Sequence, residues 1–152
     1  MKKIISGQYQ EIVDNAALKA AGLYVPAEGW IRTMRTALGM SGAQLARRLN
    51  FTRGAISDAE KNERSGAITL RTLENMAAAM NSRLVYTFVP EKSIKDVKSA
   101  RAKEKAEQIV SKADTHMALE SQELAKGQRQ YEIERIGQEL LQTMPSDFWD
   151  DN

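Results

Sequence analysis

The residues best suited to chemistry lie in one short stretch, Thr52-Arg-Gly-Ala-Ile-Ser-Asp58. Arg53 carries a planar guanidinium that can donate two parallel hydrogen bonds to paired acceptors, such as the O6 and N7 atoms of guanine. Ser57 and Asp58 add a hydroxyl and a carboxylate, and a carboxylate can accept a hydrogen bond from the N4 amino group of cytosine. These side chains suit hydrogen bonding to the edges of bases.

The composition excludes most catalytic and metal-binding classes. The chain has no cysteine and one histidine, His116, so disulfide frameworks, thiolate zinc sites and cysteine nucleophiles are excluded, and a histidine triad could use only His116. The sequence also lacks a phosphate-binding glycine loop and any metal-ligand spacing. We therefore expect no enzyme activity, no cofactor and no metal, and we interpret His116 as a solvated helix residue.

Charge is distributed unevenly along the 152 residues, although the net charge is only +2. Residues 29–82 hold 8 Lys or Arg against 4 Asp or Glu, residues 92–112 hold 7 against 3, and residues 131–152 hold 1 against 6. A basic centre suits a polyanion, although solvated helix faces often carry similar charge. No apolar run approaches the ~18 residues that span a bilayer, and Met1-Lys-Lys-Ile-Ile5 reaches polar residues too soon for the pattern of a signal peptide. We expect a soluble cytoplasmic protein.

Apolar periodicity predicts the helices that would position Arg53. Five helices are expected before residue 82, over residues 9–21, 30–38, 42–49, 53–61 and 70–81. Ser41 begins a capping box with Gln44, and Thr52 and Thr69 are competent N-caps for the two helices that follow. Asn50 tolerates the left-handed backbone that a tight turn requires.

The helices over 42–49 and 53–61 are separated by a three-residue turn, which is the pattern of a helix-turn-helix. Ala46 is small enough for two helices to cross closely, and Leu45, Leu49 and Ile56 are expected to face inward. The second helix then exposes short polar or small residues at its N-terminal end: Arg53, Gly54, Ala55, Ser57 and Asp58.

Residues 83–89 are rich in β-branched and aromatic side chains and stop at Pro90, so they predict the one strand of the chain. A lone strand leaves backbone groups unpaired, and the same strand of a second copy is the economical partner. We therefore expect a homodimer with an interface formed by Leu84, Val85, Tyr86, Thr87 and Phe88.

Beyond Pro90 the sequence predicts a helical arm. The arm is thinly apolar at first and becomes more apolar over residues 131–144 before Pro145 ends it. The tail over 146–152 places two aromatic residues among acidic ones, and we expect it to fray rather than to capture a partner.

The expected fold is therefore mainly α. It comprises an N-terminal helix and connector (1–28), a helix-turn-helix DNA-binding domain (29–82), a dimerisation strand (83–90) and a helical arm with an acidic tail (91–152).

Three stretches resemble the lambda-repressor-like, or Xre-type, DNA-binding domain over residues 29–81: Ser41-Gly-Ala-Gln-Leu-Ala-Arg-Arg-Leu-Asn50, Thr52 to Glu60, and Ile68-Thr-Leu70 through Ala77. More narrowly, residues 25–122 resemble the mobile mystery protein A family through Gly29-Trp-Ile-Arg-Thr-Met-Arg-Thr-Ala-Leu-Gly-Met-Ser41, Gly66-Ala-Ile-Thr-Leu70 and Leu84-Val-Tyr-Thr-Phe-Val-Pro90. That resemblance implies an Xre-type protein encoded beside a Fic-domain protein, in an arrangement similar to a toxin and antitoxin pair.

Two positions depart from the Xre pattern. Gly42 stands where a glutamine often holds the phosphate backbone, which weakens the transfer of that contact to this chain. Asn50 stands where glycine is usual, and this change is sterically tolerable.

The motif places the second helix in the major groove, with its first turns at the base edges. The expected base-contacting residues are Arg53, Gly54, Ala55, Ser57 and Asp58. Phosphate contacts are expected from residues at helix N-termini and around the motif's rim: Ser41, Arg47, Thr52, Asn62 and Arg64. The alternatives are a phosphate contact or plain solvation for Arg53, and an ion pair with Lys61 for Asp58. Glu60 is expected to be structural, paired with Arg35 or Arg48.

The sequence thus predicts a DNA-binding regulator, an autorepressor of its own operon that binds double-stranded operator DNA as a homodimer, with residues 92–112 adding phosphate contacts. The alternative is an antitoxin or adaptor that binds a Fic-domain protein through its C-terminal arm. An inhibitory helix of the form Ser/Thr-x-x-x-Glu-Gly/Asn has no full match here, which argues against that one mode of binding.

Overall fold

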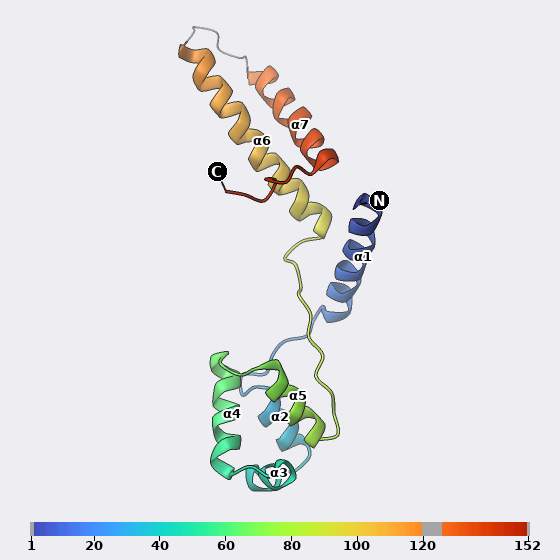
Figure 1. Cartoon of the computed structure of the whole chain (residues 1–152), viewed down its shortest axis with the longest axis vertical. Coiled ribbons are helices and arrows are strands. Elements are labelled where there is room, and N and C mark those ends of the chain that lie inside the picture. Colours follow the sequence, from blue (N-terminus) through green and yellow to red (C-terminus); the bar gives the residue numbers. More distant parts are fainter. Residues whose placement is uncertain (1, 120–125, 152) are drawn as a thin grey trace. The chain divides into compact units, whose positions relative to one another are not determined.

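The computed structural model describes residues 2–119 and 126–151, which form seven α-helices (Figure 1). They are α1 (Lys2–Ala20), α2 (Trp30–Ala37), α3 (Gly42–Leu49), α4 (Arg53–Ser65), α5 (Leu70–Ala79), α6 (Ile94–Leu119) and α7 (Lys126–Thr143). The chain divides into two compact units. We call residues 20–87 the α2–α5 unit, and residues 1–19 with 88–152 the α6–α7 unit. The N-terminal helix groups with the second of these.

The α2–α5 unit is built around one apolar core. All four helices contribute to it, because each carries apolar side chains at three- and four-residue spacing on one face. The buried members are Ile31, Leu45, Ala46, Ile56, Ala59, Met76 and Met80. The inward positions predicted for Leu45 and Ile56 are confirmed, and Leu49 packs against the core from its edge.

Side-chain caps start three of the four helices in this unit, as the sequence predicts. The hydroxyl oxygens of Ser41, Thr52 and Thr69 accept hydrogen bonds from backbone N–H groups three residues later, at 3.2, 3.1 and 3.1 Å. The Gln44 side chain completes the capping box by accepting from the Ser41 N–H at 2.7 Å. These caps satisfy helix-end donors that would otherwise lack a partner.

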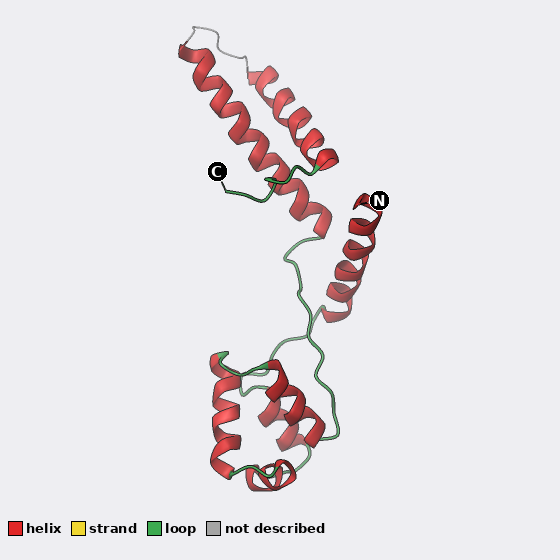
Figure 2. Cartoon of the chain, in the orientation of Figure 1, coloured by secondary structure: helices red, strands yellow, loops and turns green. Residues whose placement is uncertain are grey.

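The predicted strand over residues 83–89 is wrong for this structure. Residues 82–90 run without regular secondary structure, and no strand occurs anywhere in residues 2–119 and 126–151 (Figure 2). A strand needs a ladder of hydrogen bonds to a neighbouring strand, and no second strand occurs in the described part of the chain. Along this segment Leu84 is half-buried, whereas Val85, Tyr86, Thr87 and Phe88 are exposed.

In the α6–α7 unit the two long helices lie side by side (Figure 1). Their buried residues are mostly small, and Ala106 and Val110 of α6 meet Ile133 of α7. A Cβ at Gly137 would lie 3.8 Å from the Ala102 carbonyl oxygen, an ordinary contact, so this position of α7 lies directly against α6. The predicted helical arm is confirmed as a hairpin of helices.

The expectation that the C-terminal tail frays is wrong. Phe148 is 1% exposed, and the Arg101 side chain donates to the carbonyl oxygens of Phe148 (3.0 Å) and Asp150 (2.7 Å). The Lys105 ammonium donates to the Asp147 carbonyl oxygen and, at 3.2 Å, to its carboxylate. Both cations are buried on α6. Local composition could not show this, because the contacts join residues more than 40 positions apart.

Charged neighbours shift the pKa values of two groups at the tail, Asp147 and Arg101. The hydrogen bond from Lys105 and its positive charge lower the pKa of Asp147. A hydrogen bond to Glu104 raises the pKa of Arg101, against the opposing effect of burial, and Asp151 acts in the same direction as Glu104. The tail is therefore held in place by charged partners as well as by the Phe148 ring.

Candidate nucleic-acid interface

The turn between α3 and α4 has the geometry that the sequence predicts. Asn50 adopts the left-handed conformation, with φ 55° and ψ 38°, and Ala46 is buried where the helices cross. The Phe51 N–H donates to the Ala46 carbonyl at 2.8 Å, which closes the end of α3. Thr52 then caps α4. This turn fixes the direction in which α4 leaves α3.

α4 presents two faces of different chemistry. Ile56, Ala59 and Glu60 are buried against the unit, which locks the rotation of the helix about its axis. Ser57 and Asp58, which lie between them in the sequence, are exposed, and so is the start of the helix. Of the five predicted base-contacting residues, Arg53, Gly54, Ser57 and Asp58 are exposed and Ala55 is half-buried at the edge of that face.

Gly54 has no structural reason within this chain to lack a side chain. A Cβ at this position would meet only the Thr52 hydroxyl oxygen, at 3.8 Å, which is an ordinary contact. Alanine would be the better helix former by about 1 kcal/mol. The contacts within this chain therefore do not explain the glycine.

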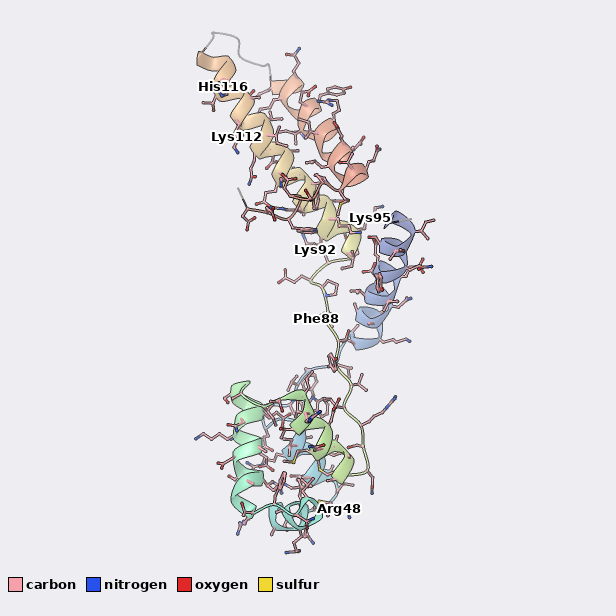
Figure 3. All side chains as sticks on the ribbon, in the orientation of Figure 1. Arg48, Phe88, Lys92, Lys95, Lys112 and His116 are labelled. Atoms are coloured by element: carbon pink, nitrogen blue, oxygen red, sulfur yellow. The ribbon has the colours of Figure 1, made fainter. Side chains whose placement is uncertain are left out.

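An ion pair with α2 holds α4 against its neighbours. The Arg35 guanidinium of α2 donates from Nε to Glu60 at 2.8 Å and from Nη1 to the Met40 carbonyl at 3.0 Å. The sequence leaves Arg35 and Arg48 as alternative partners of Glu60, and the structure selects Arg35. Arg48, at the end of α3 (Figure 3), instead donates to the Ala79 carbonyl at 2.7 Å.

Glu63 is a positioning residue that sequence reasoning missed. Its two carboxylate oxygens accept from the backbone N–H groups of Trp30 (2.6 Å) and Ile31 (3.0 Å), so a side chain of α4 caps the start of α2. Gly29 makes room for this cap, because its φ is +81° and a Cβ would lie 2.7 Å from the carboxylate. The partners are more than 30 residues apart, and no local pattern signals such a contact.

The predicted phosphate-contacting residues are all exposed and lie on α3 and α4 or at their N-terminal caps. Ser41 and Thr52 lie at the N-termini of α3 and α4, and their hydroxyls keep an O–H free to donate after accepting the cap hydrogen bond. Arg47, Asn62 and Arg64 are exposed. At 1.5 Å per residue, Arg64 lies roughly 16 Å along α4 from Arg53, which exceeds the ~12 Å width of a major groove.

A surface depression of about 480 Å³ lies beside the α2–α3 turn, and both Arg47 and Arg48 line it. Gln44 forms part of the same wall. Guanidinium groups around a shallow hollow suit an anionic oxygen such as a phosphate. The depression therefore places two basic side chains, Arg47 and Arg48, on α3 in addition to those of α4.

Lys61 is a second exposed basic residue of α4 that the sequence did not identify as a candidate DNA contact. The sequence suggests it only as an ion-pair partner of Asp58, and no such ion pair forms among the described residues. Lys61 is instead exposed, four residues after Ser57 and eight after Arg53, so the three share one side of α4. The four-residue spacing in the sequence is the signal that could have identified it.

The basic stretch over residues 92–112 is only partly available. Lys92, Lys95 and Lys112 are exposed (Figure 3), whereas Arg101 and Lys105 are buried under the tail. His116 is exposed on α6, as predicted.

Neither a metal site nor a membrane span occurs in the described residues. Within 2–119 and 126–151, no cluster of three or more His, Asp or Glu side chains is arranged to hold a metal ion. None of the helices in those ranges is long and apolar enough to cross a membrane.

Comparison with known families agrees with this geometry. Residues 31–86 match the model of the helix-turn-helix family HTH_3, a span that includes almost all of α2 and the whole of α3, α4 and α5. No curated protein and no solved structure matches the chain.

Proposed function

Residues 31–86 form an Xre-like helix-turn-helix domain, so the chain is in general a DNA-binding transcription regulator. We propose that it represses its own operon. It binds a two-fold operator as a homodimer, with α4 of each copy in a major groove. One observation carries the proposal. The first two turns of α4 leave Arg53, Gly54, Ser57 and Asp58 exposed, while Ile56, Ala59 and Glu60 are buried against the unit.

Each exposed residue then has a role. Arg53 donates two hydrogen bonds to guanine, and Asp58 accepts one from cytosine. Ser57 lies four residues after Arg53, close enough to contact the neighbouring base pair. Gly54 and Ala55 are small, and they allow the helix backbone to approach the floor of the groove.

Phosphate contacts fix the register of α4 but do not distinguish sequences. We assign them to Ser41 and Thr52, whose hydroxyls lie at helix N-termini. Arg47, Asn62 and Arg64 form the rest of the rim. Lys61 joins them because it is exposed on the same side as Ser57.

A dimer is part of this proposal. Two helix-turn-helix modules bind two half-sites about one helical turn apart, roughly 34 Å, and this doubling supplies specificity that one module lacks. Residues 84–88 are exposed or half-buried along the segment after α5, and they remain one candidate contact between the two copies.

Fluorescence anisotropy tests the proposal with the full chain, labelled DNA from upstream of its own gene, and shuffled DNA. Arg53→Ala should weaken binding to the upstream DNA by about 1–3 kcal/mol, roughly 5- to 150-fold, and remove the preference over shuffled DNA. Arg71→Ala is the matched control, because Arg71 is an exposed arginine of α5 outside the motif. Binding should also weaken steeply with salt.

Equal and weak binding of the native chain to both DNAs, unchanged in Arg53→Ala, would contradict operator recognition. A loss of binding in Arg71→Ala as large as in Arg53→Ala would move the interface from α4 to α5.

A second function, antitoxin-like binding of a Fic-domain protein, is favoured by one observation on the tail. Arg101 and Lys105 hold the tail in one conformation, and Trp149 beside Phe148 is still 54% exposed. Tryptophan is enriched among the residues that carry the binding energy of protein interfaces, so the exposed Trp149 is a candidate contact. Binding of a purified Fic-domain protein encoded beside this gene should weaken in Trp149→Ala and stay unchanged in Trp30→Ala.

A further inference from the structure

A pocket of about 250 Å³ lies within the α2–α5 unit. Residues of α2 and α5 form two of its walls, and residues 82–85, which follow α5, form a third. No residue of α3 or α4 lines it, so it contains none of the proposed DNA contacts. The pocket is therefore a candidate binding site separate from the DNA interface.

The lining of the pocket is mostly apolar and includes three methionines. Ile31, Met76 and Met80 are also buried members of the unit's core, so the inner end of the pocket reaches that core. Met34 and the 50% exposed Trp30 line it from α2. Flexible methionine side chains adapt to irregular apolar shapes, and an indole offers a flat face to a second ring. These side chains suit an apolar ligand, and above all an aromatic one.

Hydrogen bonds hold the third wall against α5. Asn81 takes a left-handed conformation, with φ 53°, just after α5. The Ser82 N–H and the Ser82 hydroxyl then both donate to the Ala77 carbonyl oxygen, each at 2.9 Å. Leu84 follows this anchor and is half-buried. The start of the segment is thus fixed to α5, although residues 82–90 have no regular secondary structure.

Arg83 is the one charged residue that lines the pocket, and it is exposed. Within residues 2–119 and 126–151, its guanidinium forms no ion pair and no hydrogen bond. A guanidinium can donate two parallel hydrogen bonds to one carboxylate. The pocket thus combines an apolar interior with a single free cation, which is complementary to an apolar anion.

We infer that the pocket binds a small aromatic carboxylate, with its ring between α2 and α5 and its carboxylate on Arg83. Small-molecule sites typically combine an apolar lining with a few polar groups that orient the ligand. A dry apolar cavity of about 150 Å³ is large enough for benzene, so about 250 Å³ accommodates one aromatic ring with a short side chain that bears the carboxylate. The charge of Arg83 disfavours a cationic ligand, and a neutral ligand would leave that charge unpaired.

Trp30 fluorescence tests this inference directly, because Trp30 lines the pocket. The full chain with Trp149→Phe has Trp30 as its one tryptophan. Titration with phenylacetate should give a saturable change in Trp30 emission. Phenylacetamide has the same ring without the charge, and it should bind roughly tenfold more weakly, because it loses the charge-assisted hydrogen bonds to Arg83.

Two pairs of variants locate the ligand. Arg83→Gln should weaken phenylacetate binding roughly tenfold and leave phenylacetamide binding unchanged. Arg71→Gln is its control, because Arg71 is an exposed arginine of α5 outside the lining. Ala77→Leu fills the pocket and should abolish binding of both compounds, whereas Ala78→Leu adds the same side chain at an exposed neighbouring position and should not. If Ala77→Leu fails to fold, the Arg83→Gln comparison decides the question by itself.

Three outcomes overturn the inference. The absence of a saturable change in Trp30 emission with phenylacetate would remove the site, and equal affinities for the two compounds would remove the role of Arg83. A Trp30 emission that shifts with protein concentration alone, and that no longer does so in Val85→Glu, would make a second copy of the chain the occupant. Arg53 does not line the pocket, so Arg53→Ala should bind phenylacetate as the native chain does. Loss of DNA recognition is therefore distinguishable from loss of this site.

Discussion

The two units of this chain bury their residues by different means. The α2–α5 unit closes around large apolar side chains, with Leu45, Ile56 and Met76 fully buried and hydroxyl caps at three helix starts. The α6–α7 unit has a narrow seam of small residues and uses Arg101 and Lys105 to bind carbonyl oxygens of the tail. The comparison shows that local caps start most helices of the α2–α5 unit, whereas the tail of the α6–α7 unit is placed by polar contacts between distant residues.

The tail needs these hydrogen bonds from Arg101 and Lys105 because its backbone is irregular. A segment outside helices and strands leaves its carbonyl groups without internal partners, and such groups are costly to bury unpaired. Arg101 and Lys105 supply the missing donors, which allows Phe148 to enter the interior. The tail is therefore part of the α6–α7 unit.

The largest expected effects are losses of stability when a fully buried side chain is removed from either unit. Phe148→Ala should lower the free energy of unfolding of the α6–α7 unit by about 3–5 kcal/mol, and Leu45→Ala should lower that of the α2–α5 unit by about 2–5 kcal/mol, because each removes a fully buried side chain. Urea denaturation checks this, since each unit holds one tryptophan, Trp30 or Trp149. Trp30→Phe and Trp149→Phe backgrounds isolate the two signals. Equal shifts of both signals in either variant would show that the units unfold together.

Breaking the Arg35–Glu60 pair should have the next largest effect. Arg35→Ala leaves the buried Glu60 carboxylate without its partner, and we expect a loss of about 1.5–3 kcal/mol in the α2–α5 unit. The control is Arg32→Ala, because Arg32 pairs with Glu28 on the exposed surface at 3.6 Å and such pairs contribute about 0–1 kcal/mol. The Trp30 signal in urea measures both. Similar losses in the two variants would contradict a structural role for Glu60.

A glycine-to-alanine substitution in each unit separates effects on stability from effects on DNA binding. Gly54→Ala should stabilise the α2–α5 unit by up to about 1 kcal/mol and weaken binding to the upstream DNA, because the added methyl group faces the proposed groove. The added methyl group of Gly7→Ala in α1 meets no atom within 4 Å, and that of Gly54→Ala makes only an ordinary contact, so Gly7→Ala is the matched control. It should stabilise its own unit and leave DNA binding unchanged. Unaltered DNA affinity in Gly54→Ala would argue against close approach at this residue.

Acid should loosen the tail without disturbing the α2–α5 unit. The folded-state pKa of Asp147 lies below the ordinary aspartate value of about 3.9, so the pair with Lys105 stabilises the fold above that pH. This stabilisation is lost as the pH falls through the lowered pKa. Trp149 fluorescence in the Trp30→Phe background should change below about pH 4, and Asp147→Asn should remove that step. A step of the same size in Asp147→Asn would assign it to another carboxyl group.

The helix-turn-helix was predictable from sequence because its signals are local. Ser41 with Gln44, Asn50 and Thr52 act on backbone groups within a few residues of themselves, and all four have the predicted geometry. The exposed set on α4 follows from the same periodicity, since the inward position of Ile56 determines which neighbours face outward. Local spacing is therefore sufficient to predict that set.

The other features required the tertiary structure. Residues 83–89 have strand-like composition, but a strand exists only with a partner to pair with. Glu63 caps α2 across more than 30 residues, and Arg101 binds a carbonyl 47 residues away. The residue types alone did not show that Glu63 and Arg101 make these contacts, because glutamate and arginine are also common on protein surfaces.

By itself, the sequence determined where the helices of the α2–α5 unit begin and which side of α4 is exposed, because caps and helical periodicity act over three or four residues. Only the tertiary structure decided which charged side chains are buried, and that the acidic tail is held on α6. Those outcomes depend on backbone donors and acceptors that come together only when distant segments pack.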